Sequence, residues 1–330
     1  MNIKKIKQRL SDQPDYRIKQ IKNALFNRGV SDWDKVTCLP KKTRRRLKEE
    51  SPLKIDADMK KSADEKTEKA SILLEDGLRV EAVLMKYEDR NTVCVSSQVG
   101  CALGCKFCAT GKMDVGRDLK AWEMIMQVYL FLSRLPEEEE VGNIVFMGMG
   151  EPFLNYEEVI KAIDYLNDEE GFNIGSRRIS VSTAGLPDKI KRFAHDRPQV
   201  NLAVSLHAAD NETRSQLMPI NDRYPLEDLF NSIDEYIEIT NRKVMFEYIP
   251  FEGINDKKSD IDNLVNLLSN RLHFINVIPY NPTGFISGVS EDELIDFKNN
   301  LRRRGLDAGI RRSFGQDIKG ACGQLASNNN

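Results

Sequence analysis

The sequence NIVFMGMGEPFLNYEEVIKAIDYLN, residues 143–167, contains the unit from which the fold is built. Its first six residues are mostly apolar and predict a buried strand over 143–148. Residues 156–167 carry one apolar stripe at helical spacing, formed by Val159, Ile160, Ile163 and Leu166, and predict an amphipathic helix. The glycine-containing turn between them, Gly148–Pro152, allows a ligand to approach the backbone closely, and Glu151 could bind an ammonium group.

The same alternation of strand and helix recurs along the chain. Strands are predicted at 92–96, 143–148, 178–182, 200–206, 243–249 and 274–278, with a further short strand at 309–311. Helices are predicted near 121–135, 156–167, 187–195, 225–239, 257–271 and 291–304. Six successive strand–helix units predict an α/β protein with a parallel sheet. Because six units do not complete an eight-stranded barrel, we expect an open partial barrel or a doubly wound sheet.

The segment before these units has a different character. Helical patterns at 16–26 and 41–50 are followed by a polar stretch at 58–69, which reads as a linker, and by a β-like run at 78–85. The sequence therefore predicts three parts. These are a small helical, basic N-terminal domain (1–68), a linking β-hairpin region (69–91), and a catalytic partial barrel (92–330).

Composition indicates a globular chain of 330 residues, with 40% hydrophobic and 30% charged residues. No apolar stretch approaches the roughly 18 residues that span a bilayer, and the N-terminus lacks a secretory signal, so we expect a cytoplasmic protein without a membrane partner.

The net charge of −2 conceals an asymmetry between the two ends of the chain. Residues 1–60 hold 17 Lys and Arg against 8 Asp and Glu, whereas the remainder is acidic. The densest basic run is formed by Lys41, Lys42, Arg44, Arg45 and Arg46, which we call the basic helix residues. They predict a surface that binds nucleic-acid phosphates, with a merely solvated helix face as the alternative.

Three cysteines lie within eight residues, at Cys101, Cys105 and Cys108. In a reducing compartment such thiols are poor disulfide candidates and suit an iron–sulfur cluster or a soft metal. Three ligands leave one position open, where a cluster iron can bind a cofactor. The alternative is a zinc site with Cys94 as fourth ligand, in an RNA-binding module without catalysis. The spacing of Cys94 from Cys101 lies outside the usual zinc knuckle.

Polar residues follow several of the predicted strands. They are Glu151, Ser182 and Thr183, Ser205 with Leu206 and His207, and Tyr280 with Asn281. Each alone is ordinary turn chemistry, but the carboxyl ends of parallel strands meet at one edge, so together they predict a ligand site. Taken alone, His207 is as consistent with a structural histidine as with a catalytic one. Glu247 lies inside a strand, and it is as consistent with a buried carboxylate whose hydrogen bonds are satisfied as with a functional group.

The cysteine motif resembles the radical S-adenosylmethionine (SAM) signature, and Gly148–Pro152 resembles the motif that holds the SAM amino group in that superfamily. The likeness is closer to the RlmN/Cfr family of RNA adenine methyltransferases. It is carried by residues 94–101, 217–221, 253–256 and 321–325, and it runs from about Asp15 to Leu325. The resemblance implies a partial (β/α)6 barrel.

The resemblance also implies a mechanism that uses two SAM molecules per turnover. Cys101, Cys105 and Cys108 would hold a [4Fe–4S] cluster. The SAM site would be lined by Gly150, Glu151, Ser182, Ser205, Leu206, His207 and Asn281. Cys322 would carry a methyl group that is activated by a radical and added to an adenine ring carbon. Glu81 would take the ring proton, and Cys94 would attack Cys322, releasing the product and leaving a disulfide.

Further implied features concern the substrate and partners. The motifs near the pocket, such as Met149–Pro152 and Glu247-Tyr248, resemble the C2-methylating RlmN type, whereas residues 221–225 and 14–20 look at least as similar to the C8-methylating Cfr type. Because motifs near the pocket weigh more than peripheral ones, the resemblance implies methylation at C2, with C8 as the alternative. The implied partners are 23S ribosomal RNA, with transfer RNA as a further candidate, and a flavodoxin or ferredoxin reductant. A monomer is the default. One departure is Lys319-Gly320, where the family usually has Asp-Ala.

Overall fold

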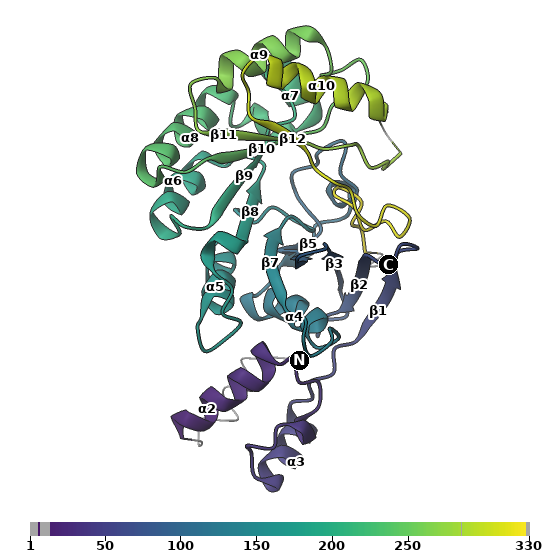
Figure 1. The fold of residues 1–330 in the computed structure, drawn as a ribbon, viewed down its shortest axis with the longest axis vertical. Helices are drawn as coiled ribbons and strands as arrows, with labels where there is room; N and C mark the ends of the chain where they lie inside the picture. Colours follow the sequence, from purple (N-terminus) through teal and green to yellow (C-terminus); the bar gives the residue numbers. More distant parts are fainter. Residues whose placement is uncertain (1–5, 7–13, 285, 328–330) are drawn as a thin grey trace.

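The computed structural model describes residue 6, residues 14–284 and residues 286–327, and a single mixed sheet organises this part of the chain (Figure 1). Within these ranges ten strands hydrogen-bond in the order β1-β2-β3-β4-β7-β8-β9-β10-β11-β12. Their bounds are β1 Ala57–Lys61, β2 Thr67–Leu73, β3 Arg79–Lys86, β4 Asn91–Cys94, β7 Val141–Phe146, β8 Ile179–Thr183, β9 Asn201–Ser205, β10 Val244–Tyr248, β11 His273–Val277 and β12 Ala308–Ile310.

The strands from β4 onward pair in parallel, which confirms the predicted α/β class and all six strand–helix units. The crossover helices are α4 Ala121–Leu132, α5 Tyr156–Asn167, α6 Pro187–Asp196, α8 Leu226–Thr240, α9 Lys258–Leu268 and α10 Glu291–Arg303. As described, the sheet has β1 and β12 at its two edges, and Figure 1 shows it curving with these helices on its outer face. It is therefore the open partial barrel, with every parallel strand ending at one edge.

The prediction of a linker at 58–69 is wrong, because most of this stretch lies in β1 and the beginning of β2. These two strands and β3 pair antiparallel and extend the sheet beyond β4. The edge strand β1 has four of its five residues charged or alanine, and its burial alternates only weakly. Edge strands are commonly charged, which masks the periodicity from which strands are predicted.

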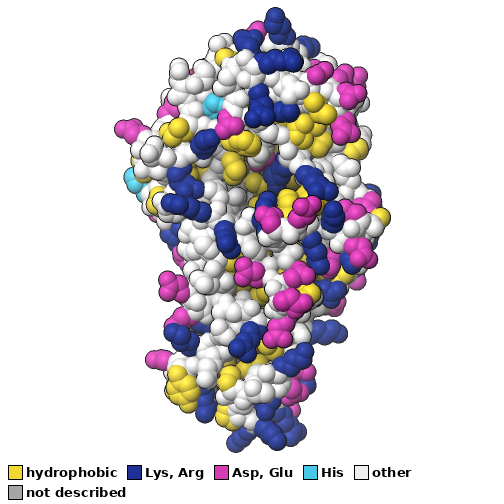
Figure 2. All heavy atoms as spheres, viewed as in Figure 1, with side chains coloured by type: hydrophobic (Ala, Val, Ile, Leu, Met, Phe, Trp, Pro, Cys, Tyr) yellow, Lys and Arg dark blue, Asp and Glu magenta, His cyan; other side chains and the backbone are white. Residues whose placement is uncertain are grey.

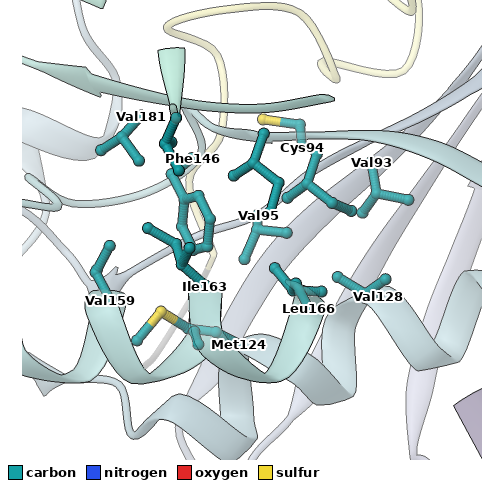
Figure 3. Close-up of a cluster of buried hydrophobic side chains, with 14 of the residues drawn as sticks. Val93, Cys94, Val95, Met124, Val128, Phe146, Val159, Ile163, Leu166 and Val181 are labelled. Carbon is teal, nitrogen blue, oxygen red and sulfur yellow. The ribbon is translucent and has the colours of Figure 1, made fainter. Parts of the chain in front are cut away.

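The core between the sheet and its helices is apolar, and Figure 3 shows part of it. Val93 and Val95 from β4 and the segment after it lie with Phe146 of β7 against α4 and α5. Cys94 lies between the two valines in sequence, and its sulfur points to the opposite side of the strand (Figure 3). Alternation along a strand therefore places Cys94 on the inner face of the partial barrel.

The N-terminal helices lie at the other end of the molecule from α9 and α10 (Figure 1). The helix predicted at 16–26 is α2, Asp15–Lys22, continued by a π-helical turn to Asn27, and the second is α3, Lys41–Glu50. A short 3-10 helix, Trp33–Lys35, lies between them, and the indole of Trp33 donates to the Ser51 carbonyl at 2.8 Å. Figure 2 shows Lys and Arg side chains at this end as well as elsewhere on the same face.

Two smaller features escaped the sequence patterns. The short helix α7, Asn211–Leu217, follows β9, and a two-stranded sheet pairs β5, Gln98–Val99, with β6, Arg117–Asp118. Both are too short to show a period. Among the helices of the described ranges, none combines the length and the apolar character that a membrane span requires.

Candidate active site

The three-cysteine motif lies in a loop that β5 and β6 close at its base. Gln98 and Asp118 pair across this small sheet, and the Gln98 amide donates to the Asp118 carboxylate at 2.7 Å. Cys101, Cys105 and Cys108 are free thiols that line a cavity of about 160 Å³ at the carboxyl edge of the parallel strands. The local fold thus brings all three predicted thiols to one side of a single cavity.

The protonation of these thiols indicates what binding a metal would require. Burial raises the pKa of Cys101 to about 12 and moves that of Cys105 in the same direction. Thiols of this kind are protonated at neutral pH, so binding iron releases protons and links occupancy to pH. Thiolate ligands are the donor set of iron–sulfur clusters, and the adjoining cavity leaves space beside them. The residues present fit a [4Fe–4S] cluster.

A single-ion site does not fit as well. Within the ranges that the structure describes, no group of three His, Cys, Asp or Glu side chains is arranged to hold one metal ion. Cys94, the fourth ligand of the zinc alternative, lines a different cavity from the three-cysteine loop. The geometry therefore does not support the zinc-site interpretation.

The turn after β7 supplies one wall of the larger cavity. Gly150 has a φ of +95°, a conformation that only glycine adopts without strain, and this turn directs Glu151 inward. The Glu151 carboxylate accepts from the backbone N–H of Phe153 at 2.9 Å and of Ala184 at 2.8 Å. Burial nevertheless raises the pKa of Glu151 to about 7, because desolvation outweighs these hydrogen bonds. A cationic ligand group beside it would restore the charged form.

The ends of the neighbouring strands β8 and β9 continue this wall, and Ser182, Ser205 and His207 line the cavity there. The His207 Nδ1 accepts from the Ile249 backbone N–H at 3.2 Å, and burial lowers the pKa of His207 to about 3. The imidazole is therefore neutral and carries its proton on Nε2. The Phe107 ring of the cysteine loop contacts it edge-on, with ring centroids 4.6 Å apart.

A fully buried arginine holds these two strand ends together. Arg214 donates to the carbonyl of Ala184 at 2.7 Å, and to those of Ser205 and Leu206 at 3.2 Å each. Its remaining partner is the Asn221 side chain, at 2.9 Å. Because a buried cation must have its hydrogen bonds satisfied, these contacts fix the spacing of the strand ends. Sequence patterns missed this residue, since α7 was not predicted.

Two of the predicted SAM residues are not among the described residues that line the cavity. Leu206 has a fully buried side chain in the main hydrophobic core. Asn281 is also buried, and its amide donates to the Cys322 carbonyl at 3.1 Å. The SAM-binding role of Leu206 and Asn281 therefore stays a prediction, and Asn281 contacts the loop that carries Cys322.

Cys322 lies at the boundary between the large cavity and a small one of about 30 Å³, and it lines both. Cys94 lines the small cavity, so the fold brings together two cysteines 228 positions apart in sequence. Burial raises the pKa of Cys94 to about 12, while the nearby Arg311 cation opposes that shift. Both thiols are free in this structure.

Arg311 lines both cavities and was not singled out by the sequence. Its guanidinium lies 3.5 Å from the Glu247 carboxylate, and Glu247 also accepts from the Asn276 amide at 3.0 Å. Glu247 is therefore the satisfied buried carboxylate that one interpretation expected. The arginine could have been found only by knowing that β12 ends beside Cys322.

Glu81 is not among the residues that line either cavity. A carboxylate in an alternating strand commonly faces solvent, but Glu81 is only 5% exposed and forms an ion pair with Lys69 at 2.9 Å. Its second oxygen accepts from the Ala326 backbone N–H at 3.0 Å. Glu81 is buried because the C-terminal loop covers this face of β3.

An open parallel barrel with a three-thiol loop at the carboxyl edge of its strands, opposite a buried carboxylate, defines a radical SAM protein. The model of the radical SAM superfamily matches residues 95–268 of the chain.

Relatives specify the family within that class. The probable dual-specificity RNA methyltransferase RlmN of Moorella thermoacetica is 45% identical over 329 residues, covering 96% of this chain and 92% of the relative. The protein of that name from Thermotoga maritima is 44% identical over 317 residues. The crystal structure of a radical SAM methyltransferase from Sphaerobacter thermophilus superposes with a TM-score of 0.92, at 42% identity and with 98% and 97% of the two chains covered. The chain belongs to the RlmN family.

Proposed function

We propose that this protein methylates an adenine of RNA at ring carbon C2, with Cys322 as the carrier of the methyl group. The observation that carries the proposal is the position of Cys322 on both cavities, between the three-cysteine loop and Cys94. A thiol that receives a methyl group on one side and is attacked on the other must be reachable from both.

Cys101, Cys105 and Cys108 hold the [4Fe–4S] cluster, and Glu151, Ser182, Ser205 and His207 hold SAM. When bound, the cluster supplies the electron that cleaves SAM reductively. The residues of the chain bind the cluster and SAM and orient SAM in the cavity. With SAM bound, the ionised Glu151 would pair with its amino group, and the neutral His207 would offer its Nε2 proton without adding positive charge to the cavity. Two SAM molecules are consumed per turnover, one as methyl donor and one as radical source.

The two remaining cysteines act in sequence. The Cys322 sulfur takes the methyl group from the first SAM. The radical derived from the second SAM would remove one hydrogen atom from that methyl group, and the resulting methylene carbon would bond to adenine C2. The ring would then lose its C2 proton to a base and return one electron to the redox group that supplied it, which leaves Cys322 and the adenine joined through the methylene carbon. The Cys94 thiolate then attacks the Cys322 sulfur, so that a sulfur–sulfur bond forms while the sulfur–carbon bond breaks. The carbon leaves with the bonding electron pair and takes up a proton, which completes the product methyl group. An external reductant must then reduce the disulfide.

The base that removes the ring proton stays a prediction. Glu81 is the residue that the family resemblance indicates, and both of its oxygens already have partners in Lys69 and Ala326. A carboxylate has further lone pairs, so this pairing does not by itself prevent proton transfer.

RNA is the substrate class that the names of the relatives state for those proteins. We assign this chain to 23S ribosomal RNA, with transfer RNA as a second substrate, a flavodoxin or ferredoxin as electron donor, and a cytoplasmic monomer as the working form. The basic helix residues on α3 hold RNA phosphates in an N-terminal domain spanning 1–68. The region 69–91 joins this domain to the barrel, 92–330. Among the basic helix residues, Lys41, Lys42 and Arg45 are exposed.

Mass spectrometry of digested ribosomal RNA tests the reaction. RNA from cells lacking the enzyme is incubated with the reconstituted protein, SAM and reductant, and 2-methyladenosine is separated from 8-methyladenosine. The proposal requires 2-methyladenosine. Exclusive 8-methyladenosine would instead assign the Cfr-type reaction, and no methyladenosine would refute an RNA adenine substrate.

A further inference from the structure

A buried ion pair lies directly beneath the loop that carries Cys322. Lys69 of β2 and Glu81 of β3 are joined at 2.9 Å, and their side chains are only 8% and 7% exposed. Burying two charges is costly, and a pair of this kind often stabilises a fold no better than apolar residues would. Its presence at this position therefore needs a reason other than stability.

The strand register explains how the pair forms. Lys69 stands opposite Val83 in the antiparallel β2–β3 pair, so Lys69 and Glu81 are diagonal neighbours on the same face. Val83 in turn stands opposite Cys94 of β4, which places the ion pair and Cys94 on one continuous inner face of the sheet. The C-terminal loop, residues 315–327, covers this face.

Both members of the pair also bind the backbone of that loop, on either side of Cys322. The Lys69 ammonium donates to the Lys319 carbonyl at 3.2 Å, three residues before Cys322. The Glu81 carboxylate accepts from the Ala326 N–H at 3.0 Å, four residues after it. Lys319 has a φ of +53°, so the first of these contacts holds a residue in a backbone conformation that it adopts only at a cost.

Other contacts hold the middle of the loop. The backbone N–H of Ala109 donates to the Gly323 carbonyl at 2.7 Å, and the Thr110 hydroxyl donates to the Leu325 carbonyl at 2.6 Å. These contacts come from the three-cysteine loop, whereas the ion pair comes from the antiparallel strands. The segment that carries Cys322 is thus hydrogen-bonded to both the three-cysteine loop and the antiparallel strands, and Cys322 itself lies at the boundary of the two cavities.

We infer that Lys69 is a positioning residue, which together with Glu81 fixes both ends of the Cys322 loop and so keeps the Cys322 sulfur aligned between the SAM cavity and Cys94. The inference rests on the proposed function for what Cys322 does. The tethering of the loop can be measured without any turnover. Hydrogen exchange and thiol alkylation involve no proton transfer by Glu81 to or from the RNA, so these measurements test positioning separately from the predicted role of Glu81 as a base.

The main variant is Lys69→Met/Glu81→Leu, which removes both tethers and leaves no unpaired buried charge. Lys69→Arg is the conservative variant, because a guanidinium can donate to both Glu81 and the Lys319 carbonyl. Glu68→Leu/Lys86→Met is the matched control. It removes a neighbouring ion pair of 3.9 Å on the same two strands, and neither of its residues has a hydrogen bond to the C-terminal loop among the described contacts.

Hydrogen exchange of the full-length protein without metal, followed by mass spectrometry, is the first measurement. Residues 315–327 of the main variant should exchange roughly tenfold faster than in the wild type, as expected for the loss of one or two hydrogen bonds. Alkylation of Cys322, normalised to the exposed Cys38, should rise in parallel. The Lys69→Arg protein and the matched control should both resemble the wild type. Far-ultraviolet circular dichroism and thermal unfolding establish that each variant is folded.

Product analysis of the reconstituted enzyme is the second measurement. Lys69→Met should cleave several SAM molecules for each methyladenosine formed, and Lys69→Arg should restore the wild-type ratio. A folded main variant with unchanged exchange and alkylation would overturn the inference. If the wild-type protein makes no methyladenosine, the proposed function fails, while the exchange measurement still decides whether the pair tethers the loop.

Discussion

Replacing Gly150 by alanine tests whether the turn after β7 builds the SAM cavity. Gly150 has a φ of +95°, which costs a residue with a Cβ about 1–2 kcal/mol. The added Cβ would also lie 2.5 Å from the Gln98 Cβ and 2.8 Å from its backbone nitrogen. Contacts this close require one of the two segments to move.

Gln98 cannot move aside cheaply. It lies in β5, its amide nitrogen donates to Asp118, and its amide oxygen accepts from the Glu151 N–H at 2.8 Å. Overpacking of this kind costs about 1–3 kcal/mol, so Gly150→Ala should lose about 2–5 kcal/mol of unfolding free energy in all. Movement of the turn should displace Glu151, the next residue in the chain. We expect SAM binding to weaken at least roughly tenfold, which corresponds to 1.4 kcal/mol.

Gly77 offers a matched control. Its φ is +86°, but no described atom lies within 4 Å of the position its Cβ would occupy. Gly77→Ala therefore carries the conformational cost alone. Urea unfolding and calorimetric SAM titration of both variants separate the cost of the positive φ from the cost of the close contacts with Gln98. The reasoning fails if Gly150→Ala loses no more stability than Gly77→Ala and binds SAM normally.

The remaining predictions concern charge, the two reactive cysteines and the strand ends. Because burial raises the pKa of Glu151 from 4.5 to about 7, its contribution to stability is full below pH 4.5 and is lost as the pH rises through about 7. Relative to the wild type, Glu151→Gln should therefore gain about 1.4 kcal/mol per pH unit in that window, and parallel pH profiles of urea unfolding would contradict this. Cys322→Ala should abolish RNA methylation, whereas Cys94→Ala should accumulate a covalent protein–RNA adduct on denaturing gels; free protein alone under turnover conditions would exclude the resolving role. Arg214→Met removes a donor from three buried carbonyls, of which only that of Leu206 keeps a partner among the described contacts, the Ala208 N–H; the change should cost about 3–5 kcal/mol in urea unfolding, a loss that a wild-type transition midpoint would disprove. Changing the basic helix residues to Gln should weaken RNA binding and flatten its salt dependence without altering SAM cleavage; unchanged RNA affinity would indicate a solvated helix face.

Periodic and closely spaced features of the chain were predictable from sequence. Residues 156–167 have an apolar stripe at helical spacing, and α5 has those same bounds. The three cysteines lie within eight residues, so their convergence on one cavity needs only a short loop. The edge strand β1 was missed because its charged residues hide the alternation, and α7 because seven residues are too few to show a period.

The site was less predictable wherever it depends on distant segments. Glu151 and Ser182 follow strands directly, so their position at one edge follows from parallel pairing. Leu206 also follows a strand, yet its side chain turns into the core. Whether a residue next to a strand end faces the cavity depends on the local backbone, and a φ of +55° at His207 redirects the chain there.

By itself, the sequence determined the succession of strands and helices, the cysteine loop and the glycine-containing turn, because each depends on neighbours within a few residues. Only the tertiary structure decided that Cys322 lies between two cavities, that Arg214 joins two strand ends, and that Lys69 and Glu81 are buried beneath the C-terminal loop. These arrangements depend on sheet register and on which segment covers which face. Such choices are made by packing between segments that lie up to 250 positions apart, and no local pattern encodes them.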